Sequence, residues 1–390
     1  MRLTALPPVR RPVPLGRGSR AARLSMERFF GNRRITLYAS GTAALAQAMV
    51  NCAARSSTSA PEVIIPAYGC PDLVAACLHA KVYPRLVDVA PAHWAYDLES
   101  LESSLSPNTV AVVAVNLLGV GDSADELIRI CKDRRIPLIQ DSAQYLPREC
   151  IKWPGDYVVL SFGRGKPLNL LHGGALIEPP GSHDTRTVHP THYSPKDRLL
   201  SSRATAIAFN VLTHPYVYGI ASALPATRLG EVIYKPLDIA QPLPERAWER
   251  VGIAFERYRQ KPSYRRDLWA SAIKEWRELG IVELRSPDTP VAVEPLRLTL
   301  LAPDRVDREL LVGRLTRKRL GASRLYASDL TGVTGIPENV RRQGPFPHAK
   351  TLADRLFTLP TYDLLRSDTI RMVRDAVLAW HRSSTGPRPP

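Results

Sequence analysis

Residues 157–175 read YVVLSFGRGKPLNLLHGGA, and this stretch decides the fold. An apolar run rich in valine opens it, and a glycine pair, Gly173 and Gly174, closes it. Buried strands are short apolar runs bounded by turn residues, so we predict a central strand over residues 157–162. Lys166 follows in a tight loop, at the sheet edge where open α/β folds bind ligands. Lysine can form a Schiff base with a carbonyl group, although an exposed loop lysine is the plainer interpretation of this residue alone.

Two upstream segments place further chemical groups at the ends of predicted elements. Residues 136–144 read IPLIQDSAQ, an apolar strand that ends at Asp141, with Gln144 three residues later. Residues 38–50 read YASGTAALAQAMV, in which a Ser-Gly-Thr triplet opens a run of good helix formers. The free backbone N–H groups at such a helix start, together with the helix dipole, form an anion site.

An amine, a carboxylate and an anion site are together what pyridoxal phosphate (PLP) requires. Its aldehyde needs the amine, its pyridinium nitrogen needs an acidic partner, and its phosphate needs hydrogen-bond donors. A nucleotide P-loop is the competing interpretation of Gly165-Lys166. It is excluded because the residue six positions before the lysine is Leu160 instead of glycine, and Pro167 stands where serine or threonine is required.

Several short motifs follow one another in a fixed order along the chain. They are SGTAAL (residues 40–45), EVIIP (62–66), VDV (87–89), DSAQ (141–144), SF (161–162), Lys166 and GGA (173–175). Weaker matches return at GASRLY (321–326) and FPHAKTLADRLFTLPTY (346–362). In this order and spacing the chain resembles the DegT/DnrJ/StrS-type aminotransferases, fold-type-I PLP enzymes that mostly aminate keto sugars carried on nucleotides. The stronger resemblance extends from residue 38 to residue 177.

The resemblance implies a role for each motif residue. Lys166 would hold PLP covalently and then move the proton at the substrate carbon. Asp141 would pair with the ring nitrogen, and Gln144 would contact the phenolic oxygen. The phosphate would be held by the backbone N–H groups of Thr42 and Ala43 and by the hydroxyl of Ser161. Helix capping and polar loop positions are simpler roles that the same residues can fill.

Three positions depart from the family's pattern. Cys70 stands where many relatives have an aromatic side chain that stacks on the pyridine ring, and Tyr68 shares a strand face with it but not its location. Asn116 stands where histidine is frequent. His172 replaces the usual acidic residue before the glycine pair; histidine titrates near neutral pH, so proton transfer is one role for it and a structural contact the favoured one. The phosphate ligand expected from a second subunit is not recognisable within residues 230–239.

Length and alternating patterns predict an α/β protein of two domains. A chain of 390 residues exceeds one comfortable core, and its 44% hydrophobic and 23% charged residues are ordinary for a soluble protein. Strand and helix signals alternate over residues 31–180, which predicts a mostly parallel sheet covered by helices. We expect a Pro/Arg-rich arm with little structure of its own (1–30), a large PLP-binding α/β domain (31–250), a small C-terminal α+β domain (251–384) and a disordered tail (385–390). The arm is expected to act as a packing strap.

The individual elements are predicted from periodicity and turn residues. Strands are expected at residues 63–67, 85–89, 110–117, 137–140, 157–162, 175–177 and 291–301. Helices are expected at residues 42–53, 72–80, 97–105, 123–134, 307–320 and 368–381, with Ser123 as a helix cap. Residues 180–197 are expected to form a loop, and residues 245–278 a helical connection between the domains.

Cysteine usage and hydropathy indicate a cytoplasmic protein. The five cysteines are odd in number and form no CxxC pair, which argues against a zinc site or a disulfide framework. The first residues lack the apolar stretch of a signal peptide. Residues 198–224 are apolar but interrupted by Arg203, Asn210 and His214, so no membrane-spanning helix is expected there. We expect this segment to pack in an interface, with peripheral membrane contact as the less favoured alternative.

The formal net charge of +16 favours anionic partners in general. A solvated basic face is the favoured interpretation, attraction of a phosphorylated substrate is second, and nucleic acid is last because no nucleic-acid-binding motif accompanies the arginines.

From the motifs and the resemblance together, we expect a homodimeric PLP-dependent aminotransferase without a metal. It would move an amino group from an amino acid, glutamate in most relatives, to a nucleotide-linked keto sugar. The alternatives are a transaminase of a non-sugar ketone such as a cyclitol, or a catalytically silent PLP-fold scaffold.

Overall fold

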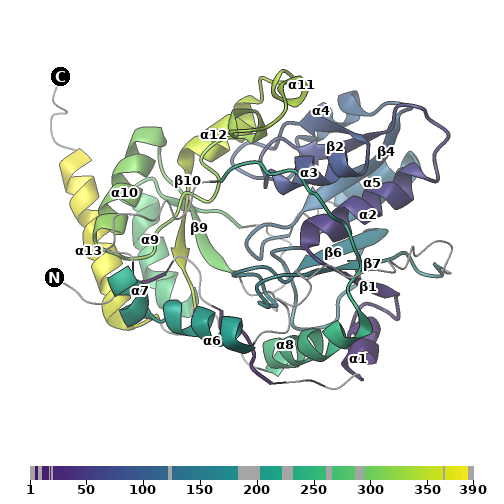
Figure 1. Cartoon of the computed structure of the whole chain (residues 1–390). Helices are drawn as coiled ribbons and strands as arrows, with labels where there is room; N and C mark the ends of the chain where they lie inside the picture. The colour runs from purple at the N-terminus through teal and green to yellow at the C-terminus, as the bar shows by residue number, and fades with distance from the viewer. Residues whose placement is uncertain are drawn as a thin grey trace.

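A seven-stranded sheet forms the centre of the computed structural model (Figure 1), which describes residues 5–7, 11–16, 18, 21–121, 125–182, 203–221, 232–260, 266–285, 293, 295–362 and 365–384. The strands are β1 (Ile35–Tyr38), β2 (Glu62–Pro66), β3 (Tyr83–Val87), β4 (Thr109–Val115), β5 (Leu138–Asp141), β6 (Tyr157–Ser161) and β7 (Gly174–Ile177). Their spatial order is β1-β7-β6-β5-β4-β2-β3. Strands β2 to β6 pair in parallel, whereas β7 runs antiparallel to both of its neighbours. The predicted mixed α/β fold with a mostly parallel sheet is thus confirmed.

Helices cover both faces of this sheet, and its strands are therefore buried on both sides. They are α1 (Ala22–Phe29), α2 (Gly41–Ala53), α3 (Asp72–His79), α4 (Leu98–Ser104), α5 (Asp125–Asp133) and α8 (Trp248–Gln260). Side chains alternate along a strand, so Val63 and Ile65 of β2 pack in the core beneath α2 and α3. Ile64 between them faces the opposite core, beneath α4 and α5. At the other end of that face, α1 and α8 cover β6, with Phe29 and Phe255 in edge-to-face contact at 5.3 Å.

A second, three-stranded antiparallel sheet organises the C-terminal part, on the side of α9, α10 and α13 in Figure 1. It consists of β8 (Val282–Glu283), β9 (Arg297–Leu301) and β10 (Leu356–Pro360), with the helices η3 (Arg266–Trp269), α9 (Ala270–Glu278), α10 (Arg305–Arg317) and α13 (Ser367–Ser384). Three buried tryptophans, Trp269, Trp276 and Trp380, belong to its core. This separate core agrees with a smaller α+β unit.

One C-terminal segment leaves the small core and packs on the large sheet. It includes η4 (Leu330–Gly332), α11 (Glu338–Arg341) and α12 (Pro347–Arg355). The N–H of Leu330 donates to the carbonyl of Ala67 at 2.8 Å. The carboxylate of Asp88 accepts from the N–H groups of His348 and Ala349 at 3.0 and 2.8 Å, so it caps α12. Residues more than 250 positions apart are therefore fixed together beside the end of β2.

Three predictions about the elements are corrected by the structure. The arm is not without structure: residues 22–29 form α1, whose Met26 and Phe29 lie in the core beneath α8. Strand β1 was not predicted; turn residues flank it at Gly31-Asn32 and Ser40-Gly41, but a run of four residues is too short to show a periodic pattern. Strand β3 begins two residues earlier than predicted; it lies at the sheet edge, where Pro84 is tolerated despite its missing N–H.

The arm packs along the chain as a strap, as expected. Val13 is buried, and both its N–H and its carbonyl are hydrogen-bonded to the side chain of Asn210. Gly18 donates its N–H to the carbonyl of Glu249 at 2.8 Å. The predicted domain boundary at residue 250 falls inside the continuous helix α8, so the division into domains stays a prediction at this point.

Some predictions fall on residues outside the described ranges. They concern the Ser123 cap, residues 183–197 of the predicted loop and the tail at 385–390. The apolar segment contains two short helices in its described part, α6 (Arg203–Leu212) and α7 (Pro215–Ala221). Across the described stretches, none of the helices has both the length and the apolarity that crossing a bilayer demands.

Candidate active site

One cavity lies at the carboxyl ends of β4, β5 and β6. It brings together five of the predicted site residues, Thr42, Asp141, Gln144, Ser161 and Lys166. The sixth, Ala43, is fully buried and does not line it. Its other walls are made by Gly41, Leu45, Cys70, Asp72, Leu73, Val115, Asn116, Leu117, Ala143 and Tyr326. The predicted amine and carboxylate therefore share one space.

The loop that carries Lys166 is fixed at both ends by backbone hydrogen bonds. Phe162 at its start donates to the carbonyl of Gly173 and accepts from the N–H of Leu170, each at 2.8 Å. The lysine closes a turn by donating its N–H to the carbonyl of Gly163 at 3.2 Å. Gly165 precedes it with φ +74°, a left-handed conformation that glycine adopts without steric cost. The lysine is thus presented from a rigid turn.

Asp141 ends β5 and lies half-buried in the cavity wall, surrounded closely by protein. Burial raises the pKa of Asp141, and the charge of Asp72 adds to the rise. The N–H of Ala143, donated to Oδ1 at 3.0 Å, and the positive charge of Lys166 lower the pKa by a smaller amount. A buried carboxylate of this kind is stabilised in its charged form by a cation placed against it.

Helix α2 begins against the ends of β6 and β7. A Cβ atom on Gly41 would lie 2.7 Å from the Cβ of Ser161, and one on Gly174 would lie 2.6 Å from the backbone of Gly41. Glycine at these two positions allows the helix start to approach the strands this closely. The Oγ of Ser40 caps the helix by accepting from the N–H of Ala43 at 3.0 Å. A phosphate would therefore compete with this cap for Ala43, whereas Thr42 contributes a first-turn N–H that has no partner within the helix.

Gln144 is held by two hydrogen bonds that orient its amide. Its Oε1 accepts from the N–H of Leu118, and its Nε2 donates to the hydroxyl of Tyr326, both at 3.4 Å. Leu118 has φ +53°, an uncommon conformation for a residue other than glycine and a frequent one near functional sites. Asn116 lies beside this pair, buried, and donates to the Oγ of Ser142 at 2.8 Å.

Cys70, which stands where many relatives have an aromatic side chain, lies beside Tyr326 from the C-terminal segment. Burial raises the pKa of Cys70 to about 12, so its thiol is neutral. Tyr326 lies beside that thiol and lines the cavity, and burial raises its own pKa, with the nearby Cys70 adding to the rise. The ring of Tyr68 lies against that of Tyr326 at 5.7 Å in an edge-to-face arrangement and does not line the cavity. Tyr326, not Tyr68, is therefore the aromatic residue in the wall.

Two wall residues were not identified from sequence. Tyr326 belongs to the GASRLY motif, which signalled family resemblance but not a place in the site. Asp72 begins α3 and accepts from the hydroxyl of Thr42 at 3.2 Å. Nothing in its local sequence distinguishes it from an ordinary acidic residue in a first helical turn.

His172 does not line the cavity, and its side chain is exposed. Its partial burial, with a smaller contribution from the charge of Arg164, lowers its pKa, so it is uncharged at neutral pH. The suggested role in proton transfer is not supported by this placement. The described part of residues 230–239 includes Tyr234, whose N–H donates to the carbonyl of Thr334 at 3.1 Å.

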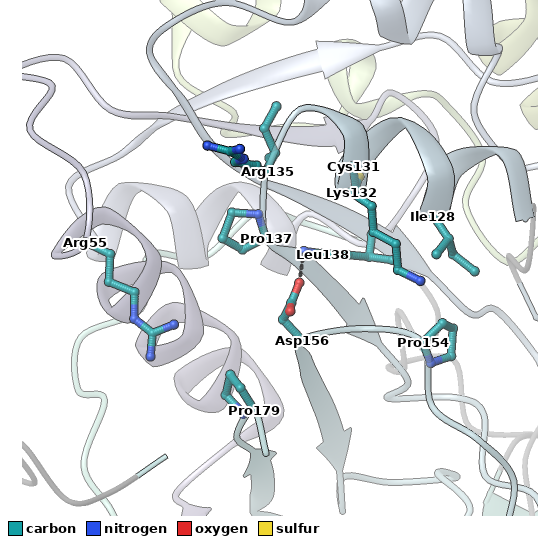
Figure 2. Close-up of a pocket in the computed structure, with 11 residues that line it drawn as sticks. Arg55, Ile128, Cys131, Lys132, Arg135, Pro137, Leu138, Pro154, Asp156 and Pro179 are labelled. Carbon is teal, nitrogen blue, oxygen red and sulfur yellow. Dashed lines mark hydrogen bonds between the residues drawn. The ribbon is translucent and has the colours of Figure 1, made fainter. Parts of the chain in front are cut away.

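A larger hollow of about 250 Å³ lies at the opposite edge of the sheet, near the amino ends of β5 and β6. Figure 2 shows the charged ends of Arg55, Lys132 and Arg135 on different sides of the Asp156 carboxylate. That carboxylate accepts from the N–H of Leu138 at 2.8 Å. These cations do not converge on one point, so size alone does not make this hollow a site. Among the described side chains, no group of three or more His, Cys, Asp or Glu residues is placed to hold a metal ion.

The sequence comparisons agree with the geometry of the cavity. Residues 16–188 match the family described as the DegT/DnrJ/EryC1/StrS aminotransferase family, which confirms the predicted resemblance over that part of the chain. The L-glutamine:2-deoxy-scyllo-inosose aminotransferase of Micromonospora echinospora is 30% identical over 155 residues, which are 38% of this chain and 36% of that protein. The curated relatives are matched over only 23% to 41% of their own lengths.

Solved structures extend the likeness to almost the whole chain. DesI, in the presence of its TDP-sugar product, has a TM-score of 0.65 at 20% identity, covering 98% of this chain and 94% of that one. NtdA from Bacillus subtilis with bound cofactor PMP has a TM-score of 0.65 at 16% identity, covering 94% of this chain and 78% of that one. At these identities the likeness concerns the fold, and it confirms the predicted fold type.

Proposed function

We propose that this chain, whose residues 16–188 match the DegT/DnrJ/EryC1/StrS aminotransferase family, is a PLP-dependent aminotransferase acting on a keto sugar or a keto cyclitol. The observation that carries the proposal is the shared cavity of Lys166 and Asp141. A scaffold without catalysis has no need of a primary amine facing a carboxylate whose burial is unfavourable.

The donor set of the cavity fits PLP. Asp141 is a half-buried carboxylate whose pKa is raised by desolvation, so a cation placed against it favours its charged form, and a protonated pyridine nitrogen is such a cation. Thr42 at the start of α2 and the hydroxyl of Ser161 would hold the phosphate, and Gln144 would meet the phenolic oxygen. When bound, PLP supplies an electron sink for the carbon that loses or gains the amino group.

The chain's own residues then have separate tasks. Lys166 holds the cofactor and, once released from it, moves a proton at the substrate carbon from its Nζ atom. Its turn fixes the backbone from which the side chain reaches into the cavity. The hydrogen bonds of Gln144 to Leu118 and Tyr326 fix the orientation of its amide. The neutral thiol of Cys70 adds no charge to the cavity wall.

Two observations bear on the substrate. The net charge of +16 favours an anionic substrate such as a nucleotide-linked keto sugar, with glutamate as the donor. The curated relative is named for glutamine and a free inosose, which favours a keto cyclitol without phosphate. We propose the nucleotide-linked keto sugar first and the keto cyclitol second.

Cofactor binding is tested by absorbance. The purified protein with PLP is expected to be yellow, and Lys166→Ala is expected to lose the visible band of the lysine-linked cofactor while keeping the fold. Lys152→Ala, on a loop residue outside the cavity, serves as the matched control. A wild-type protein that stays colourless and is not stabilised by PLP contradicts the proposal.

Substrate choice is tested in half-reactions of the amine form of the cofactor. The loaded protein is mixed separately with TDP- and UDP-linked keto sugars and with scyllo-inosose, and return of the lysine-linked band is followed. Reaction with the nucleotide sugars alone supports the first substrate class, and reaction with the inosose alone supports the second. Glutamate and glutamine are compared in the reverse half-reaction.

We also propose a homodimer, as the family resemblance implies. Light scattering after gel filtration is expected to give twice the chain mass of 43.2 kDa. A monomeric mass at the concentrations used for activity contradicts this.

A further inference from the structure

Asn169 is a buried amide that the proposed mechanism does not use. It lies three positions after Lys166 in the loop of residues 162–173, which we call the lysine loop. Asn169 is only 3% exposed, so its polar atoms must find partners within the protein. Its Oδ1 accepts from the N–H of Leu171 at 3.2 Å, and its Nδ2 donates to the carbonyl of Arg11 at 2.5 Å. One side chain therefore joins the lysine loop to the N-terminal arm, 158 positions earlier in the chain.

Leu171 is the point at which the lysine loop is strained. Its φ is +72°, a left-handed conformation that is uncommon for a residue other than glycine. Such conformations persist where the surrounding structure holds them, and they gather at functional sites. The amide oxygen of Asn169 holds the N–H of this leucine, and the leucine side chain packs with Val13 of the arm and Ala206 of α6. The strained backbone is therefore held by Asn169 within the loop and by the arm outside it.

The arm contacts every second residue that follows the lysine. The guanidinium of Arg11 donates to the carbonyl of Pro167 at 3.4 Å. The carbonyl of Arg11 accepts from Asn169, and Val13 packs with Leu171. The stretch after the lysine is therefore held at three successive points, at positions 167, 169 and 171.

The arm is itself anchored on both sides of these contacts. Before them, the N–H of Leu6 donates to the carbonyl of Arg319 in the small C-terminal unit at 3.0 Å. At their end, the side chain of Asn210 in α6 bonds both the N–H and the carbonyl of Val13, at 2.7 and 3.0 Å. The lysine loop is therefore held against a segment whose own backbone is fixed.

We propose that Asn169, together with Arg11 and Val13 of the arm, positions Lys166 for the reaction; we call these three residues the arm clamp. The inference rests on the proposed function, because it concerns the amine that holds the cofactor. The hydrogen bonds of Phe162 fix the base of the lysine loop, and the arm clamp fixes the part that follows the lysine. Displacement of a reacting group by about 1 Å can cost about a hundredfold in rate, so contacts outside the cavity affect the chemistry. Asn169 is in this sense a positioning residue and not a catalytic one.

The first test measures the lysine loop in the full chain without cofactor. Asn169→Ala removes both hydrogen bonds of the amide, and Asn210→Ala releases the arm at Val13 while leaving the loop sequence unchanged. In both variants the backbone amides of residues 166–171 are expected to exchange with deuterium about tenfold faster than in the wild type, because local opening of the loop becomes easier. Mass spectrometry of the loop peptide measures this exchange.

A matched control comes from another amide that joins two segments. Gln343 accepts from the N–H of Leu86 at 2.9 Å and donates to the carbonyl of Pro84 at 2.8 Å, at the β3 edge of the large sheet. Gln343→Ala therefore removes the same two kinds of hydrogen bond, and exchange in residues 166–171 is expected to stay as in the wild type. Circular dichroism verifies that each variant folds.

The second test measures the reaction per cofactor-loaded site. Each protein is loaded with PLP and mixed with glutamate or glutamine, and loss of the visible band is followed and divided by its starting height. Asn169→Ala and Asn210→Ala are expected to lower the maximal rate about 10- to 100-fold and to change the half-saturating donor concentration less than about threefold, because the arm clamp does not line the cavity. A merely structural role would lower the fraction of loaded sites and leave the rate per site unchanged.

The proposal is overturned if Asn169→Ala gives the result of Gln343→Ala in either measurement. It is also overturned if Asn210→Ala leaves the exchange of residues 166–171 unchanged, because the arm then has no part in holding the loop. Failure of the proposed function gives a different result: a wild-type protein that binds no PLP shows no visible band, whereas the exchange measurement still tests the hold of the arm clamp on the loop.

Discussion

Replacing Asp141 by asparagine separates the cost of burying a carboxylate from its use in holding the cofactor. In the chain without cofactor, burial raises the pKa of Asp141 more than the Ala143 N–H and the Lys166 charge lower it. The ordinary carboxyl pKa is 3.8, and the pKa of Asp141 in the folded chain lies above it. At pH values between these two, the unfolded chain has released the proton of this carboxyl, whereas the folded chain still holds it. Over that interval the free energy of unfolding falls as pH rises, and above it the full cost remains.

Asparagine keeps the shape of the side chain and removes the charge. Asp141→Asn is therefore expected to raise the unfolding free energy of the cofactor-free protein by about 1–3 kcal/mol at neutral pH, the cost of a poorly compensated buried polar group. The gain is expected to shrink as pH falls below the raised pKa and to vanish below 3.8, where the wild-type carboxyl is protonated in both the folded and the unfolded chain. Cofactor affinity is expected to change in the opposite direction. Loss of one partner of a buried ion pair costs about 3–5 kcal/mol, or roughly 150- to 5,000-fold in dissociation constant.

Denaturant unfolding of the cofactor-free wild type and variant, at about pH 5 and about pH 8, measures the first effect. Titration with PLP, followed by absorbance, measures the second. Asp133→Asn, at an exposed site at the end of α5, is the control for loss of a carboxylate as such. If the variant and the wild type are equally stable at both pH values, or if their PLP affinities agree within threefold, the assignment of Asp141 is refuted.

Three further predictions concern the cavity wall. Asp72→Asn removes a negative charge beside the start of α2, so PLP affinity, measured by titration, is expected to rise about threefold to tenfold; a fall would contradict the phosphate placement. Tyr326→Phe leaves the Nε2 of Gln144 without its acceptor, so PLP binding is expected to weaken by a similar factor and the pH dependence of the bound cofactor's absorbance is expected to shift. The control Tyr362→Phe is expected to change neither the affinity nor the absorbance. The thiol of Cys70, with its pKa raised to about 12, is expected to react slowly with iodoacetamide at pH 8, followed by mass spectrometry; rapid alkylation there would contradict its burial.

The sequence predicted the parts of the site that lie at the ends of strands. Asp141, Ser161 and Lys166 each follow an apolar run, and parallel strands bring their carboxyl ends to one edge. Their shared location could be predicted because each group follows its own strand, while their roles toward a cofactor stay predictions. Each residue could be located from its own strand, without knowing which residues face it across the cavity.

Contacts between distant segments escaped the same reasoning. Tyr326 is 182 positions from Gln144. It is held at the cavity by the hydrogen bond of Leu330 to Ala67 and by that of the Tyr68 hydroxyl to its own carbonyl. No local pattern encodes such a contact. In the same way, α1 was hidden because the composition of the arm is dominated by proline and arginine, although Met26 and Phe29 are three positions apart on one helical face.

The departures from the family's pattern are coupled to one another through the C-terminal segment. An aromatic side chain at position 70 would compete with the Tyr326 ring for the same part of the wall, because the two residues lie beside each other in the lining of one cavity. The small side chain at Cys70 therefore allows the tyrosine to enter, and the tyrosine in turn accepts from Gln144. The replacement at position 70 is consequently not a simple loss of a stacking partner. It moves the aromatic group of the wall from the strand end to a loop that is held in place by Asp88 and Leu330, so the small C-terminal unit contributes to the shape of the site.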